Sequence, residues 1–189
     1  PVTNMARTDS NPIPLHSAAP EFRLINVVTD QWINLPKLNE YKATVIMFIC
    51  NHCPYVIHVN PELIRLANDY TLKGVRFIAI SSNDVTHYPD DSPELMVVQA
   101  KQLNYPFPYC YDESQEVAKA YDAACTPDFY VFNAELKLAY HGRLDASRPG
   151  NDLPLNGADM RNALDALLLN EAPSEIQYPS MGCNIKWKK

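Results

Sequence analysis

The chain lacks the sequence features that are typical of several common protein classes. Its apolar runs fall well short of the roughly 20 residues that a membrane-spanning helix needs. Its first residues, PVTNMARTDSNP, have no apolar core of the signal-peptide kind. No internal repeat and no low-complexity tract is visible, which excludes repeat and fibrous architectures. We therefore expect no membrane partner and a location in the cytoplasm.

Positive charge is also scarce. Lysine and arginine together number 16 against 22 acidic residues, which gives a net charge of -6. No basic cluster offsets this balance, and the nearest one, Lys186-Trp187-Lys188-Lys189, reads as a short polar end of the tail. Because nucleic-acid binding depends on basic residues that neutralise phosphates, we expect no nucleic-acid partner.

The cysteines are too few for a disulfide-stapled secreted scaffold, and their number, 5, is odd. A structural zinc site needs a second CxxC motif or a close Cys/His pair, and the chain has one CxxC motif without such a partner. We therefore expect neither a metal nor another cofactor. The function class that remains is one in which the cysteine thiols themselves react.

The composition is that of a soluble globular protein. The chain has 189 residues and a mass of 21.4 kDa, with 47% hydrophobic and 20% charged residues. This length predicts one domain with a single sizeable core. We expect an N-terminal arm over residues 1–14, the domain over 15–172, and a C-terminal tail over 173–189 that packs on the domain.

The stretch of residues 43–55, ATVIMFICNHCPY, carries the strongest signal for chemistry. Its apolar run, residues 45–49, does not alternate with polar residues, which is typical of a buried central strand of a parallel sheet. Pro54 suits the first position of a helix, where its missing amide proton has no partner to lose. Cys50 and Cys53 thus lie between a strand end and a helix start, where free N–H groups and the helix dipole favour thiolates.

Strands and helices alternate along the rest of the chain. Residues 1–20 predict an arm or irregular lead-in, and 82–91 a polar loop. The pattern predicts hairpins over 21–28 and 31–35 and over 128–132 and 136–140, and a strand over 75–81. It predicts helices over 54–72, 93–103, 112–123 and 160–168. The helix over 112–123 has a predicted capping box from Asp112 to Gln115. This order gives an α/β layer fold with a mixed sheet.

The CxxC motif predicts a redox-active pair. At a helix start the first sulfur is usually the exposed nucleophile, and the second lies beneath it as the resolving thiol, so Cys50 and Cys53 can cycle between dithiol and disulfide. A zinc half-site or inert thiols are the alternatives. His52 is predicted to stabilise the Cys50 thiolate and make the pair more oxidising, the alternative being a solvent-facing residue on a turn.

These elements in this order resemble the thioredoxin-like superfamily. Cys50-Asn51-His52-Cys53 stands at its CxxC position and Thr126-Pro127 at that of its cis-proline. The hairpin before the first core strand and the extra segment 82–91 resemble the peroxiredoxin branch, related to alkyl hydroperoxide reductase and thiol-specific antioxidant proteins. The closer resemblance spans about residues 15–189, on CNHCPYVIHVNPE, CTPDFYVF, GRLDASRPGN and PSMGCNIKWK. It implies a thioredoxin-like α/β fold, with a mixed central sheet flanked by helices and an N-terminal β-hairpin.

The resemblance also implies roles outside the motif. A cis bond between Thr126 and Pro127 would direct the preceding backbone outward to pair with a bound polypeptide strand, whereas an ordinary trans proline is the alternative. Cys125 directly precedes this pair, and Cys183 lies in a tail that could reach the same face. Either thiol is a candidate to resolve a sulfenic acid or a mixed disulfide, or else a packed, inert thiol. Cys110, between two tyrosines, is expected to be a packing residue.

The chain departs from both resembled families. Peroxiredoxins have a Pro-x-x-x-Thr-x-x-Cys loop, and with Cys53 as its cysteine, Ile46 replaces the proline and Cys50 the threonine. Thioredoxins carry a buried carboxylate six residues before the first cysteine, where this chain has Thr44. The chain therefore has the cysteines of both families and the full accessory set of neither.

The leading hypothesis is a thiol–disulfide oxidoreductase or peroxiredoxin-like antioxidant enzyme, whose substrate is a protein disulfide or a peroxide. Cys50 attacks a disulfide, or Cys50 or Cys53 attacks a peroxide, and the partner thiol closes an intramolecular disulfide. An external thiol reductant, such as a thioredoxin or glutathione system, then restores the dithiol. Arg143 or Arg148 is a candidate to hold a peroxide beside the thiolate, as an arginine does in peroxiredoxins, the alternative being a solvated loop charge.

Two other hypotheses remain open. A soft-metal protein would bind or deliver copper as Cu(I), held by Cys50 and Cys53 with His141. Thioredoxin-fold copper-delivery proteins space their cysteines one residue wider, which counts against this hypothesis. A redox-inactive structural member of the fold is the third possibility, and two intact cysteines count against it.

Overall fold

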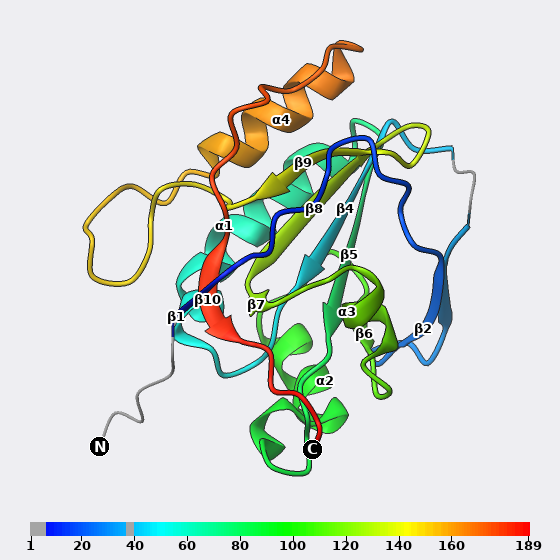
Figure 1. Ribbon diagram of the computed structural model, residues 1–189. Coiled ribbons are helices and arrows are strands. Elements are labelled where there is room, and N and C mark those ends of the chain that lie inside the picture. Colours follow the sequence, from blue (N-terminus) through cyan, green and yellow to red (C-terminus); the bar gives the residue numbers. More distant parts are fainter. Residues whose placement is uncertain (1–6, 37–39) are drawn as a thin grey trace.

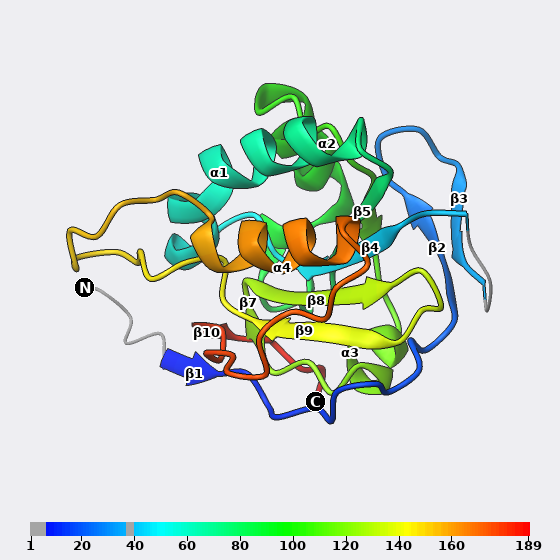
Figure 2. The same cartoon turned by 90° about the horizontal axis from the view of Figure 1, so that it is seen from above.

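A seven-stranded mixed sheet with helices on both faces forms the body of the protein (Figures 1 and 2). The structure, a computed structural model, describes residues 7–36 and 40–189. In order across the sheet, the strands are β3 (Trp32–Leu35), β2 (Phe22–Asn26), β6 (Tyr109–Tyr111), β5 (Val75–Ser81), β4 (Ala43–Phe48), β8 (Asp128–Asn133) and β9 (Leu138–Gly142). The helices are α1 (Pro54–Thr71), α2 (Pro93–Gln102), α3 (Glu116–Ala120), α4 (Ala158–Leu168) and the short 3-10 turn η1 (Pro89–Asp91). The predicted mixed α/β fold is confirmed, and β2 and β3 form the predicted antiparallel hairpin.

β4 lies inside the sheet, as its apolar run predicts. Its 6 residues are all buried, and it pairs parallel with β5 and antiparallel with β8. Successive side chains of a strand point to opposite faces. Val45 and Met47 therefore join the core cluster under α1 and α4, whereas Ile46 and Phe48 join the cluster beside α3. Packing on both faces fixes the end of β4, from which the cysteine motif follows.

α1 begins directly after Cys53. Cys53 is its N-cap residue, and Pro54 follows in the first turn, where its fixed φ suits a helix. Leu63 and Leu66 are fully buried in the cluster that this helix forms with the sheet. Gly74, just beyond the helix end, has a φ of 93°, in the left-handed region that favours glycine. Among the described residues, no helix combines the length and the apolar character needed to cross a bilayer.

Three short strands form a second sheet that joins the two ends of the chain. β10 (Met181–Asn184) pairs antiparallel with both β1 (Arg7–Asp9) and β7 (Cys125–Thr126), and Figure 1 shows it in red beside β1 in blue. Through this pairing, the C-terminal segment lies against the strand that carries Cys125 and Thr126. The prediction of an irregular lead-in is wrong for Arg7–Asp9, because its strand partner lies at the far end of the chain. Residues 1–6 of the predicted arm lie outside the described residues.

Gly182 sets how closely β10 approaches β7. A Cβ atom at this position would lie 1.9 Å from the carbonyl oxygen of Thr126, so any larger residue would force the strands apart. In the register of the pair, Cys183 lies opposite Thr126. The lack of a side chain at Gly182 thus allows the next residue, Cys183, to lie against the backbone beside Pro127.

The helix predicted over 112–123 is shorter, and its predicted capping box is wrong. The carboxylate of Asp112 accepts hydrogen bonds from the amides of Val117 and Ala118, at 3.3 and 2.9 Å, so it caps α3 from farther back in the chain. Gln115 has a φ of 65°, and its side-chain amide donates to two carbonyl oxygens outside this segment. It therefore bridges loops instead of returning to the helix start.

Two strand boundaries also differ from the prediction. β6 was not predicted, because 3 residues are too few to show a periodic pattern. Cys110 lies within it and is fully buried in the core, as expected of a packing residue. β9 begins two residues later than predicted, since Leu136 takes a φ of 56° in the turn.

Candidate active site

The two cysteines of the CxxC motif lie where the sequence places them, between the end of β4 and the start of α1. Both are buried, with 1% of Cys50 and 0% of Cys53 exposed. The prediction that Cys50 is the exposed sulfur is therefore wrong. The helix starts at Pro54, so it is the second cysteine, not the first, that occupies the N-cap.

Cys53 is the sulfur with the strongest tendency to ionise. Its pKa is lowered below the ordinary thiol value, chiefly by hydrogen bonds with the Cys183 and Cys50 thiols and further by the amides of Val56 and Cys183, while burial acts in the opposite direction. Its Sγ lies 2.6 Å from the Cys183 Sγ. A sulfur anion that accepts several donors at a helix N-terminus is stabilised in the same way as other reactive thiolates.

Cys50 has the opposite character. Its pKa is raised well above the ordinary value, first by its hydrogen bond to Cys53, then by burial and by the negative charge of Asp91. Its Sγ lies 3.6 Å from the hydroxyl of Thr126. The directions of the two pKa shifts favour a protonated Cys50 and an ionised Cys53. A stabilising role of His52 toward a Cys50 thiolate stays a prediction.

The rate at which hydrogen peroxide oxidises Cys53 is expected to stay nearly constant between about pH 6 and pH 8. A thiol with the ordinary pKa of about 8.5 loses roughly tenfold in rate for each pH unit below that value, because the thiolate is the nucleophile. The lowered pKa of Cys53 leaves the thiolate fully formed throughout this range. Peptide mapping of Cys53 oxidation at each pH measures the profile.

The Cys183→Ser variant is the control, since it weakens the largest cause of that lowered pKa. Its oxidation rate should begin to depend on pH. A tenfold rise per pH unit in the unaltered protein would contradict the assignment of Cys53 as the thiolate.

Asp91 is a residue of this site that the sequence did not single out. It is fully buried, and its carboxylate, the His52 ring and the Cys50 sulfur each place one atom within 4.8 Å of the other two. His52 Nδ1 lies 2.8 Å from Asp91 Oδ2, so the two form an ion pair when the imidazole is protonated. The pKa of His52 is raised, chiefly by Asp91. The residues around Asp91 predict only a polar loop, and no spacing among them points to the cysteines.

Asp91 is held by donors from two segments. The backbone amide of Asn51 donates to Oδ1 at 2.8 Å, and the side-chain amide of Asn83 donates to Oδ2 at 2.8 Å. The side-chain oxygen of Asn83 in turn accepts the amide of Lys186 at 2.9 Å, which ties the C-terminal tail to the same cluster. The buried carboxylate is therefore well paired.

The peptide bond between Thr126 and Pro127 is cis, as the resemblance implies. The expectation that the Thr126 backbone is free to pair with a bound polypeptide is wrong for this structure. β10 pairs with that edge and places Cys183 opposite Thr126. The tail of the chain thus covers the strand edge that a polypeptide substrate would use.

The remaining cysteine near the cis-proline has a different environment. Cys125 is fully buried, its pKa is raised by burial, and its sulfur lies 4.0 Å from the carbonyl oxygen of Pro127. The pKa of Cys110 is raised to about 12, also by burial. Of the predicted resolving thiols, it is Cys183 whose sulfur contacts Cys53. A resolving role for Cys125 stays a prediction.

The structure does not assemble the predicted soft-metal site. His141 Nε2 lies 3.0 Å from Asp128 Oδ1, and its ring stacks on Tyr130 with ring centres 4.1 Å apart. Within the described chain, the one group of three potential ligand atoms is that of Cys50, His52 and Asp91. Both carboxylate oxygens already accept hydrogen bonds and the imidazole faces the same carboxylate, so we interpret this group as an acid–base cluster.

A small hollow of about 30 Å³ opens beside the cis-proline. Pro127, Met181, Arg143 and Arg148 are among the residues that line it. Arg143 Nε pairs with Asp159 at 2.6 Å, and Arg148 Nη1 lies 3.3 Å from the Met181 sulfur. Both arginines named as candidates thus lie near the cis-proline. A role in holding peroxide stays a prediction for each.

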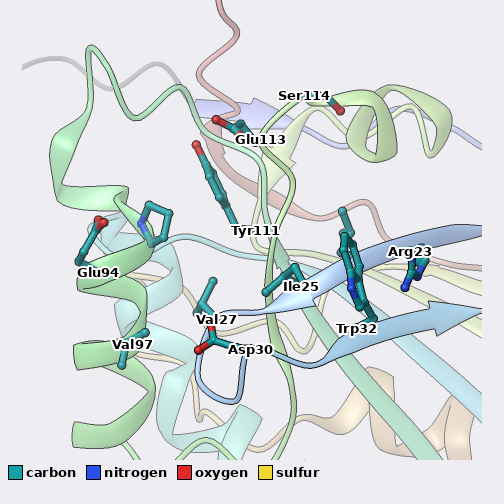
Figure 3. Close-up of a pocket in the computed structure, with 12 residues that line it drawn as sticks. Arg23, Ile25, Val27, Asp30, Trp32, Glu94, Val97, Tyr111, Glu113 and Ser114 are labelled. Carbon is teal, nitrogen blue, oxygen red and sulfur yellow. The ribbon is translucent and has the colours of Figure 1, made fainter.

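A larger pocket of about 560 Å³ lies between α2 and the β2–β3 hairpin (Figure 3). Trp32 and Tyr111 contribute aromatic rings to its lining, and the Arg23 guanidinium lies 4.0 Å from the centre of the Trp32 ring. None of its lining residues is a cysteine. This pocket is therefore not part of the thiol site.

The fold and the buried dithiol at the start of α1 define a thioredoxin-like protein. Residues 15–141 match the AhpC/TSA family, and the chain belongs to that family. This confirms the thioredoxin-like resemblance with peroxiredoxin-like relatives. Family and fold together identify the protein as a thiol oxidoreductase.

Several solved structures are similar to this chain. An uncharacterized conserved protein from Geobacillus kaustophilus is 58% identical, with a TM-score of 0.95 and 98% of each chain covered. A hypothetical protein from Sinorhizobium meliloti is 41% identical, with a TM-score of 0.93 over 96% of this chain and 98% of that one. A putative thioredoxin from Neisseria meningitidis, 21% identical with a TM-score of 0.63 over 80% of this chain and 90% of that one, is similar in fold. No curated protein matches the chain.

Proposed function

We propose that this protein is a thiol-dependent peroxidase in which the Cys53 thiolate attacks a small hydroperoxide. The observation that carries the proposal is the position of the Cys53 sulfur, at the N-terminus of α1 and in contact with two other thiols. The Cys53 side chain is fully buried, so a small oxidant has the better access. The pairing of β10 with Thr126 favours the same class of substrate, because a polypeptide would have to displace that strand.

The reaction balances with the thiols present. The Cys53 thiolate attacks one peroxide oxygen, the O–O bond breaks, and the alkoxide leaves and takes a proton to form an alcohol. Cys53 is then a sulfenic acid, which a neighbouring thiol attacks to form a disulfide and release water. Cys50 and Cys183 both lie close enough to Cys53 for this step. An external dithiol, such as a thioredoxin or glutathione system, restores the resting state by two exchange steps.

Reduction of a protein disulfide uses the same sulfurs with a different partner. It requires that β10 leave the Thr126 edge so that a substrate strand can pair there. The initial rates of peroxide reduction and of protein disulfide reduction can therefore be compared. Initial rates with hydrogen peroxide, a small organic hydroperoxide and insulin, each with the same dithiol reductant, should be far higher for the hydroperoxides. Insulin reduction at an equal or greater rate would overturn the peroxidase assignment and favour a disulfide reductase.

Replacing Cys50 should affect turnover less than replacing the attacking sulfur. In the Cys50→Ser variant, Cys53 keeps its contact with Cys183, so peroxide is still reduced once and the disulfide forms with Cys183. Steady-state turnover is expected to fall by about one order of magnitude, because the exchange with the external dithiol then starts from a different disulfide. Peroxide consumption at fixed dithiol concentration measures the change. An unchanged rate in both Cys50→Ser and Cys53→Ser would exclude the proposed function.

The soft-metal alternative predicts a different result. Copper as Cu(I) would be held by Cys50 and Cys53 and would stay with the protein through gel filtration. Stoichiometric copper after this step, lost in both cysteine variants, would favour that alternative. We expect no copper to remain bound. We also expect that the protein acts in the cytoplasm and that an external thiol system is its electron donor.

A further inference from the structure

When Cys50 is the thiol that attacks the Cys53 sulfenic acid, it loses a proton at a buried position. Cys50 is a thiol rather than a thiolate, and its neighbours oppose ionisation. Only 1% of it is exposed, so solvent cannot take the proton directly. A buried thiol that attacks Cys53 therefore needs an acceptor within the protein.

We propose that Asp91 and His52 form the proton-accepting pair of Cys50, in which Asp91 is the positioning residue and His52 exchanges the proton with solvent. The proposal rests on the proposed function, since it concerns the step that closes the Cys50–Cys53 disulfide. It gives the fully buried Asp91 a role in that step.

The geometry supports a path from the sulfur to the surface. The Cys50 sulfur, a His52 ring nitrogen and an Asp91 oxygen lie within 4.8 Å of one another. The His52 side chain is 25% exposed and that of Asp91 is 0% exposed. Of the two, the imidazole is thus the member that can pass a proton to water. The carboxylate lies where it can orient the ring and balance its charge.

The ring and the carboxylate are both fixed by their surroundings. Asn51 and Asn83 each donate a hydrogen bond to Asp91, which fixes the position of its carboxylate. The ring of His52 stacks on Tyr88, with centres 6.3 Å apart and planes 7° apart. A base held in one orientation needs little rearrangement when it takes the proton.

Other titratable or charged groups also face this cluster. They are Cys53, Tyr88, Asp90, Tyr105, Tyr109 and Lys186. Asp91 raises the pKa of His52 more than Cys53 or Asp90 does. The Tyr109 hydroxyl donates to the Asn51 side chain at 2.8 Å, and the Lys186 ammonium lies 5.6 Å from the Tyr88 ring centre. Asp91 is therefore the dominant charge that His52 faces.

The step balances without a further reactant. Cys50–SH attacks the sulfur of Cys53–SOH, a bond forms between the two sulfurs, and the S–O bond breaks. The proton of Cys50 passes to the neutral His52 imidazole, and the hydroxide that leaves takes a proton from solvent and becomes water. His52 returns its proton to solvent. The Cys50–Cys53 disulfide and one water are the products.

This role predicts how disulfide closure depends on pH. Neutral His52 is the acceptor, so closure speeds up as pH rises through the raised pKa of His52. Removing the Asp91 charge removes the main cause of that raised pKa, so in Asp91→Asn the midpoint moves to lower pH. The plateau rate should fall about 10²-fold, at the lower end of general acid–base contributions. His52→Gln should abolish the pH-dependent rise.

The test is a single-turnover experiment in a Cys183→Ser background, where Cys50 is the partner that remains in contact with Cys53. One equivalent of hydrogen peroxide is added from pH 5 to pH 9, and samples are quenched at intervals. The Cys53 sulfenic acid and the Cys50–Cys53 disulfide are measured separately by mass spectrometry, so that the rate of disulfide closure is obtained apart from the rate of oxidation, which itself depends on pH in this background. Asp90→Asn is the matched control, because it removes the neighbouring charge from an exposed position. We expect a small shift in midpoint and a normal plateau for this control.

The outcomes separate the two proposals. A normal midpoint and plateau in Asp91→Asn would overturn the proton-transfer role while leaving the peroxidase intact. Failure to oxidise Cys53 in the unaltered protein would instead overturn the proposed function. If Asp91→Asn fails to fold, as circular dichroism would reveal, His52→Gln decides, since His52 is partly exposed. A pH profile in His52→Gln identical to that of the background protein would then overturn the role.

Discussion

Replacing Cys53 by serine is expected to reduce peroxide turnover by a factor on the order of 10³ or more. Cys53 is the sulfur whose pKa is lowered and the one in contact with both other thiols of the site. Serine has nearly the same shape, but its hydroxyl does not ionise near neutral pH and does not form a disulfide. Peroxide consumption with excess dithiol, followed at neutral pH, measures the loss.

Cys110→Ala is the control for this variant. Cys110 is as deeply buried as Cys53, but it lies in the core cluster on the other face of the sheet. Its removal should leave turnover within about twofold of the unaltered protein and should cost stability instead, because it leaves a small cavity. Equal losses in Cys110→Ala and Cys53→Ser would indicate that unfolding, and not chemistry, explains the effect.

Replacing Gly182 by alanine is expected to lower the free energy of unfolding by about 1–3 kcal/mol, the usual cost of overpacking. The added Cβ would meet the Thr126 carbonyl oxygen at 1.9 Å, and a backbone atom cannot rotate away as a side chain can. β10 therefore has to shift from β7, and Cys183 moves away from Cys53. Urea unfolding measures the first effect. The yield of Cys53–Cys183 disulfide in a Cys50→Ser background measures the second.

Gly150→Ala separates this clash from the general effect of replacing a glycine. At Gly150 nothing lies within 4 Å of the added Cβ, although its φ of 84° makes alanine unfavourable there. Gly150→Ala should therefore lower stability without changing which cysteines pair. Normal stability in Gly182→Ala, together with a full yield of the Cys53–Cys183 bond, would show that the close approach of β10 does not position Cys183.

The sequence was sufficient to predict those parts of the fold and of the site that depend on local interactions. The unbroken apolar run of β4 and the proline at the start of α1 can each be recognised within a few residues of the sequence. The same is true of the predicted cis bond before Pro127, which followed from a resemblance carried by a short motif. These features fixed the position of the dithiol within the fold.

The rest of the site depends on contacts between distant segments. β1, β7 and β10 are 2 to 4 residues long and pair across nearly the whole chain, so none shows a pattern of its own. Asp91 reaches Cys50 and His52 only because η1 folds over the motif, and its neighbours in sequence give no sign of this. Contacts of this kind also give the two cysteines different environments. The negative charge of Asp91 opposes ionisation of Cys50, while Cys183 supports that of Cys53.

Mass spectrometry of the cysteines after one equivalent of hydrogen peroxide tests the role of Cys53 most directly. The protein is oxidised at neutral pH, the remaining thiols are alkylated, and the peptides are mapped without reduction. We predict that Cys53 is consumed first and is recovered in a disulfide with Cys50 or Cys183, while Cys110 and Cys125 are alkylated in full. Recovery of Cys53 as a free thiol, with the oxidation found at another cysteine or at none, would contradict its assignment as the attacking sulfur.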